Sequence, residues 1–200
     1  MRQILKNTIW LTVFTVLTYA SNGQDLKVSV APTWNSAFYY RFVTGGPSRE
    51  AKSGMNASIE YMRPLSEMVK YGFGVGYQFC TVGIIPAPFS ESSPHTESLS
   101  LVSACVKIEF HFRKEYFLSV DPFIGYQPDY NSWQTIDNQT GLGLSIGFGK
   151  QIPVFKSGFI EIEPKLWVYN IVPFADINLP MRLTIFGLKA GFILCHSKNR

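Results

Sequence analysis

Residues 69–80 read V-K-Y-G-F-G-V-G-Y-Q-F-C, and this stretch decides the fold class. Every odd position is bulky and apolar or aromatic, and every even position is small or polar. Successive side chains of a β-strand point to opposite faces, so the pattern predicts a strand with two different faces. A face in water would carry mainly Lys, Glu and Thr, whereas glycine in a strand marks the close approach of a neighbour. An apolar face opposite a crowded, glycine-rich face is typical of a membrane barrel with a narrow polar lumen.

The same alternation recurs along the rest of the chain. In each stretch one parity is apolar, and the other carries glycine, small polar or charged side chains. The predicted strands cover about residues 26–38, 55–61, 69–80, 102–113, 116–126, 141–149, 160–168 and 184–192.

The connections between these stretches alternate in length. Three are short, and the other four cover about residues 43–53, 83–97, 127–140 and 170–180. Outer-membrane barrels have short periplasmic turns and longer external loops. With both ends of the barrel in the periplasm, the first connection should be long, and it is. The sequence therefore predicts an all-β fold, an eight-stranded antiparallel up-and-down transmembrane β-barrel.

Three prolines lie inside the predicted strands: Pro32, Pro122 and Pro164. Proline has no N–H to donate, and a closed sheet has no free edge where the missing donor is harmless. We expect bulges or lumen water to accommodate them.

Over about residues 24–194 the chain resembles the small eight-stranded outer-membrane barrel family, typified by the OmpA membrane domain and OmpX. The resemblance rests on the alternation and the loop lengths, without a family-specific motif. It implies a monomer in the cell outer membrane that contacts membrane lipid and lipopolysaccharide and is inserted by the outer-membrane assembly machinery. An aromatic residue usually ends the last strand of such barrels; Phe192 could serve, but the chain continues to Arg200.

The start of the chain predicts export. Arg2 and Lys6 precede an apolar run over residues 8–19, which is followed by small residues, as in a secretory signal. The run is shorter than the roughly 20 residues that a membrane-spanning helix needs. We predict a signal peptide at residues 1–23 and the outer-membrane barrel domain at residues 24–200.

Inward-facing charges predict a plugged lumen. Eight strands enclose a space that side chains can fill, and buried charges are stable only when they are paired. The inward charges nearly cancel in sign. The predicted lumen network comprises Lys70, Lys107, Glu109, His111, Arg113, Asp121, Glu161, Glu163, Lys165 and Lys189, and the same parity adds Lys27 and Glu60. A small gated pore, with this network as its gate, is the alternative.

Other classes of function have little support in the sequence. Charged residues make up only 16% of the chain, and no arginine-rich stripe suggests a nucleic-acid partner. Cys80 and Cys105 are predicted to be small lumen-filling side chains rather than a disulfide. Barrel deacylases of lipid A use a His-x-Ser motif, which the stretch His111-Phe112-Arg113 does not match. We predict no enzyme activity, no cofactor and no metal.

The long loops are the remaining candidates for recognition. Their tips carry Tyr40, Phe42, Pro88, Phe89, Tyr130, Trp133, Asp137 and Phe174. Trp34, Tyr77, Tyr126 and Tyr169 near strand ends are candidates for the aromatic girdle at the membrane surface. We predict a structural or surface-interaction role through the four external loops, with a surface or periplasmic protein partner left open. The alternatives are a small transport or assembly factor of the outer membrane, or a lipocalin-like soluble carrier with its apolar face turned inward.

Overall fold

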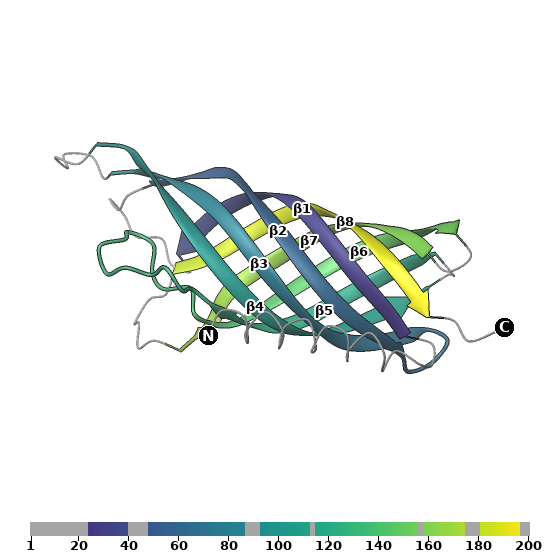
Figure 1. Cartoon of the computed structure of the whole chain (residues 1–200). Helices are drawn as coiled ribbons and strands as arrows, with labels where there is room; N and C mark the ends of the chain where they lie inside the picture. The colour runs from purple at the N-terminus through teal and green to yellow at the C-terminus, as the bar shows by residue number, and fades with distance from the viewer. Residues whose placement is uncertain are drawn as a thin grey trace, which may run out of the picture.

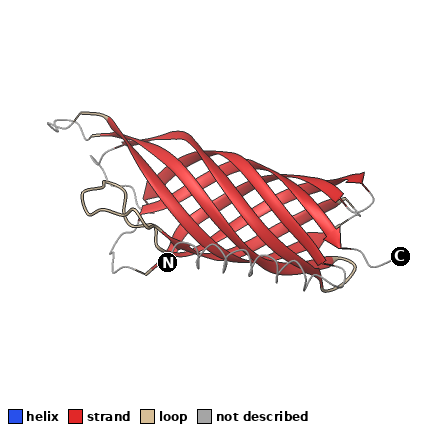
Figure 2. Cartoon of the chain, in the orientation of Figure 1, coloured by secondary structure: helices blue, strands red, loops and turns tan. Residues whose placement is uncertain are grey.

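The computed structural model describes residues 24–39, 48–86, 93–112, 115–155, 158–174 and 181–196. Each strand pairs antiparallel with the next, and the last pairs with the first, so the sheet closes into a barrel (Figure 1). The strands cross the barrel obliquely and account for nearly all of its wall (Figure 2). They are β1 (Gln24–Tyr39), β2 (Ser48–Pro64), β3 (Val69–Ile85), β4 (His95–His111), β5 (Tyr116–Tyr126), β6 (Gly141–Phe155), β7 (Gly158–Pro173) and β8 (Met181–His196).

The predicted eight-stranded antiparallel barrel is confirmed. The predicted signal peptide at residues 1–23 and the loop residues 40–47, 87–92 and 175–180 lie outside the described residues. None of the described residues lies in a helix with the length and hydropathy of a membrane span.

The outer wall carries the apolar parity of the sequence. Phe73 and Val75 on β3 are 61% and 59% exposed, and Ile146 and Phe148 on β6 also point outward. A soluble carrier of the lipocalin type would enclose these side chains around its ligand. They lie outside the barrel instead, so the soluble-carrier alternative is wrong.

Toward the long loops, the apolar residues of the strands change from the outward face to the inward face. On β4 the even-numbered positions face outward throughout, but the outward residue is apolar at Val102 and polar at Ser98. The inward residues Leu99 and Leu101 are apolar and buried. The same change occurs on β3 beyond Phe79 and on β8 before Phe186, where buried apolar side chains replace exposed ones. Lipid favours apolar outward side chains and water favours polar ones, so the strands leave the bilayer where the alternation reverses.

The strands extend further toward the long loops than predicted, so parts of three predicted loops are wrong. Residues 48–53, 83–85, 95–97 and 170–173 belong to β2, β3, β4 and β7, and β4 also includes residues 98–101, which lay between the predicted loop and the predicted strand. On β4 the inward Leu99 and Leu101 are apolar and the outward Ser98 is polar, as in a water-soluble sheet. The predicted loop at residues 127–140, by contrast, contains no strand in the structure.

Each of the three prolines interrupts the pairing with one neighbouring strand only. Pro122 stays paired with Leu144 on β6, while its pairing with β4 is missing between Cys105↔Phe123 and Ile108↔Val120. Pro32 loses its pairing toward β8 and Pro164 toward β6 in the same way. The register is unchanged on both sides of each gap, so the predicted bulges at these prolines are wrong.

A bulge does occur on β7, beside Gly143. Leu142 pairs with Val172 and Leu144 with Val168, so three residues of β7 lie opposite one of β6. Within it Asn170 has a φ of 58°, a left-handed conformation that asparagine tolerates better than most residues.

Tyr169 continues the inward parity of Lys165 and Trp167, and the bulge adds Asn170 to the buried side chains beside it. The prediction of Tyr169 as a girdle residue is therefore wrong. Trp34, Tyr77 and Tyr126 do lie on the outer face.

Candidate functional site

The half of the lumen nearer the short turns holds four lysines and five carboxylates, which we call the ion-pair layer. They project from six of the eight strands, and all nine side chains are buried. The ion-pair layer consists of Lys27, Lys107, Lys165, Lys189, Glu60, Glu109, Glu161, Glu163 and Asp121.

The remaining strands, β3 and β6, make room for these charges with glycine. A Cβ on Gly74 would lie 2.9 Å from Cγ of Glu60, and a Cβ on Gly147 would lie 2.2 Å from Oε1 of Glu163. The glycine-rich faces of the two clearest strands in the sequence are thus the space into which the charged side chains fold.

Each lysine of the ion-pair layer meets at least two carboxylates. Lys27 Nζ donates to Glu109 at 2.5 Å and to Glu161 at 2.7 Å. Glu60 accepts from Lys107 at 2.9 Å and from Lys189 at 2.5 Å.

Lys165 pairs with Asp121 and Glu163, and Ser119 donates a hydrogen bond to Glu163. Such mutual pairing is what buried charges need, because desolvation penalises each of them separately.

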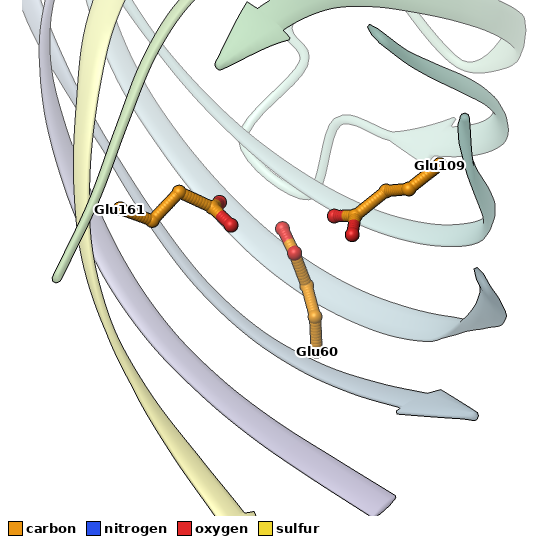
Figure 3. A group of neighbouring side chains, drawn as sticks. All are labelled: Glu60, Glu109 and Glu161. Atoms are coloured by element: carbon orange, nitrogen blue, oxygen red, sulfur yellow. The ribbon is translucent and has the colours of Figure 1, made fainter. Parts of the chain in front are cut away.

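Three of these carboxylates point toward one another from β2, β4 and β7 (Figure 3). One oxygen each of Glu60, Glu109 and Glu161 lies within 4.8 Å of the others, a spacing that could hold a cation. Lysine ammonium groups already bond these oxygens, Lys27 to two of the carboxylates and Lys107 to a third. We therefore assign this group to the ion-pair layer and not to a metal centre.

Of the remaining residues of the predicted network, Lys70 lies apart from this layer and His111 contacts it. Lys70 pairs with Asp25 at 2.6 Å near the end of the barrel and is one quarter exposed. His111 lies 3.3 Å from Glu109, beside the ring of Phe117. Arg113 lies outside the described residues.

Beyond the ion-pair layer, toward the long loops, the lumen is filled by apolar side chains, which the sequence analysis did not predict. Phe123 and Tyr169 pack edge to face, with ring centroids 4.7 Å apart. We call the whole set the apolar core: Ala31, Ala37, Cys80, Val82, Ile84, Leu99, Leu101, Phe123, Ile136, Trp167, Tyr169, Met181, Leu183 and Ile185. Cys80 is a free thiol within it, and Cys105, also free, packs against it.

One member of the apolar core comes from a loop. Ile136 belongs to residues 127–140, which we call the cap loop, and its side chain is fully buried. Gln139, also fully buried, donates to the carbonyl oxygen of Met181 at 3.0 Å and accepts from the N–H of Leu183 at 2.9 Å. Asp137 accepts from the N–H of Met181 at 2.9 Å. The cap loop therefore packs against the apolar core at the loop-side end of the lumen and bonds to the backbone of β8.

The cap loop also covers the edge of β4. β5 ends its pairing with β4 at Val102, so residues 95–101 of β4 have no partner strand on that side. The N–H of Ser100 donates to Asp129 at 2.9 Å, and Glu97 accepts from the N–H groups of Thr135 at 2.7 Å and Ile136 at 3.2 Å. Bonding of this kind protects an edge that could otherwise pair with another chain.

Glu97 lies on the water side of the point where β4 leaves the bilayer. Partial burial acts to raise the pKa of this carboxyl, but the N–H donors of Thr135 and Ile136 outweigh it and hold the pKa below its ordinary value. Glu97 therefore remains charged at neutral pH and holds the cap loop in place.

No family model matches the sequence, and no curated protein matches it. Solved membrane barrels do match the structure. The outer membrane protein OprG from Pseudomonas aeruginosa matches with a TM-score of 0.58 at 8% identity, over 88% of this chain and 97% of that one. The outer membrane protein AlkL, solved in DMPC bilayers, matches with a TM-score of 0.54 at 11% identity, over 90% of this chain and 92% of that one.

At these identities the likeness shows the fold. Together with the apolar outer wall, it shows that the chain has the transmembrane barrel fold of small outer-membrane proteins. The predicted resemblance to small eight-stranded outer-membrane barrels is confirmed.

Proposed function

We propose that this protein is a non-conducting barrel of the cell outer membrane that acts at the surface through the cap loop and the strand ends around it. One observation carries the proposal: the lumen is filled twice, first by the ion-pair layer and then by the apolar core under Ile136. A hydrated solute would have to separate buried ion pairs, each worth about 3–5 kcal/mol when one partner is lost. It would then have to shed its water to cross the apolar core. Any activity toward solutes or partners therefore lies outside the lumen.

Location and assembly are part of the same proposal. The apolar outer wall fits the acyl chains of membrane lipid, and its outer rim would meet lipopolysaccharide. A signal peptide at residues 1–23 would export the chain, and the outer-membrane assembly machinery would insert it. The absence of enzyme activity stays a prediction.

Conductance in a planar lipid bilayer tests the closed lumen. The purified, folded barrel should give no steady current steps at voltages where a general porin conducts. Glu109→Ala, which removes one acceptor of Lys27, should also stay silent, because the apolar core remains as a second closure. Stable open steps from the wild-type barrel would overturn the proposal.

A small transport role is a second candidate, and one feature favours it. The apolar core is closed from outside by a loop held through side chains such as Glu97 and Gln139, and not by strand pairing. Release of this loop would expose an apolar interior to an apolar solute. Faster entry of an apolar fluorescent dye into vesicles containing Glu97→Gln than into those containing wild type would favour this candidate.

A further inference from the structure

The tip of the cap loop leaves a large aromatic ring in water. Residues 128–133 read P-D-Y-N-S-W, and all six are exposed. The side chain of Trp133 is 89% exposed, more than any other large apolar side chain of the described residues, and Tyr130 is 40% exposed. An aromatic side chain gains by burial, so an indole held out in solvent lacks a contact that a ligand would supply.

The tip is also held in one conformation. The N–H of Trp133 donates to Oδ1 of Asn131 at 3.2 Å, and the N–H of Gln134 donates to the carbonyl oxygen of Asn131 at 3.0 Å. Asp129 is tied to β4 through Ser100. A ligand that binds this tip loses little free energy in ordering its backbone.

The size of this surface restricts the partner. One aromatic side chain buries about 150–250 Å², whereas a stable protein partner needs about 800 Å² on each side. A sugar ring matches the smaller area, since a pyranose has one face of C–H groups and a rim of hydroxyls. Asp129, Asn131 and Ser132, exposed in the same six-residue tip, add a carboxylate, an amide and a hydroxyl, the groups that bond such hydroxyls.

We propose that residues 128–133 form a carbohydrate-binding site in which Trp133 stacks on the apolar face of a pyranose. The site deepens the proposed surface role and rests on it. The tip carries no lysine or arginine, so the site suits neutral sugars over sulfated or phosphorylated ones. Two sources share this chemistry: the sugars of lipopolysaccharide in the same leaflet, and polysaccharide outside the cell.

Calorimetric titration of the folded full barrel in DMPC nanodiscs, which contain no sugar, tests the site. The two probes are a neutral outer-core oligosaccharide of lipopolysaccharide, free of acidic sugars and phosphate, and dextran; heparin is the charged control. We expect saturable binding of at least one neutral probe and weaker binding of heparin. Trp133→Ala should weaken the neutral interaction at least tenfold, and Trp133→Tyr, which keeps a ring, should retain most of it.

Trp34→Ala is the matched control, because Trp34 is an exposed tryptophan on the outer wall that stacks on Phe186. It should bind sugar like wild type. A preference for core oligosaccharide would identify lipopolysaccharide as the source, and a preference for dextran would identify free polysaccharide. Absence of saturable binding by either neutral probe, or equal binding by wild type and Trp133→Ala, overturns the site.

Conductance of the same purified barrel in a planar lipid bilayer separates the two proposals. A silent barrel that binds no sugar overturns the carbohydrate site alone, and a conducting barrel overturns the proposed function. A gel shift between boiled and unboiled samples verifies that each variant is folded.

Discussion

Lys107 on β4 donates a hydrogen bond of 2.9 Å to Glu60 on β2, although β3 lies between these two strands in the sheet. The two side chains can meet because β3 presents Gly74 to the lumen at this level. A Cβ there would lie 2.9 Å from both the Glu60 side chain and the sulfur of Cys105. The glycine on β3 therefore provides the space in which side chains of β2 and β4 form their ion pair.

Glu60→Gln should destabilise the barrel by about 3–5 kcal/mol, because it removes the charge shared by Lys107 and Lys189 and leaves both ammonium groups buried. Urea unfolding of the barrel in lipid vesicles measures this loss. The control is Glu50→Gln. Glu50 pairs with Lys52 at 3.0 Å in an exposed position, so its loss should change the unfolding free energy by less than about 1 kcal/mol. Equal losses for the two variants would contradict the role of the ion-pair layer.

Gly149→Ala should destabilise the barrel by about 1–3 kcal/mol through overpacking. A Cβ at this position would lie 2.2 Å from the ring of Phe117, which is fully buried. Gly83→Ala serves as the control because its nearest neighbour, at 2.9 Å, is the flexible end of Lys52. The midpoint of heat-induced unfolding on gels should fall for Gly149→Ala and stay near wild type for Gly83→Ala.

Ile146→Arg should cost about 2–4 kcal/mol, because Ile146 points into lipid from the middle of β6. Ser98→Arg also places arginine on the outer wall, but on the water side of β4, and should fold like wild type. Yields of folded barrel after dilution into vesicles compare the two. If Ile146→Arg folded as well as Ser98→Arg, the assigned outward face of β6 would be wrong.

The hold of Glu97 on the cap loop should weaken in acid. The folded pKa of Glu97 lies below its unfolded value of about 4.3, so its contribution is complete above that pH and is lost as the pH falls through the folded pKa. Hydrogen exchange of the Thr135 and Ile136 amides should lose protection over this acid range. In Glu97→Gln, protection should be lower already at pH 7 and should not fall further in acid; a wild-type-like acid profile in this variant would show that another group holds the loop.

The sequence predicted most of what lies within the bilayer. Lipid forces one parity of a strand to be apolar, so the inward parity of residues such as Lys107 and Glu161 could be read from their neighbours. Their partners could not, because the pairing of Lys107 with Glu60 depends on how far each strand is shifted along the closed sheet.

Outside the bilayer, inward and outward positions could not be predicted from the apolar parity. On β4 the apolar residues before Val102 are Leu99 and Leu101, which have the opposite parity, so the sequence predicts the strand only from residue 102 and places residues 95–97 in a loop. Tyr169 has the inward parity of Trp167, so its burial could have been predicted by extending the alternation of β7 by two residues. The burial of Asn170 depends on its left-handed backbone and on the pairing around Gly143, which have no local signal. The burial of Ile136 depends on hydrogen bonds to β4 and β8, strands distant in sequence.

The change from polar to apolar residues on the outer face also fixes the depth of the barrel in the membrane. Ser100 and Val102 are successive outward positions on β4, and Thr184 and Phe186 are their equivalents on β8, so each pair brackets the membrane surface within two residues. A thicker bilayer would place Ser100 and Thr184 in hydrocarbon. A thinner one would leave Val102 and Phe186 in water. The depth of the barrel in the bilayer is therefore set by these two changes of polarity, on β4 and β8, which are four strands apart in the closed sheet.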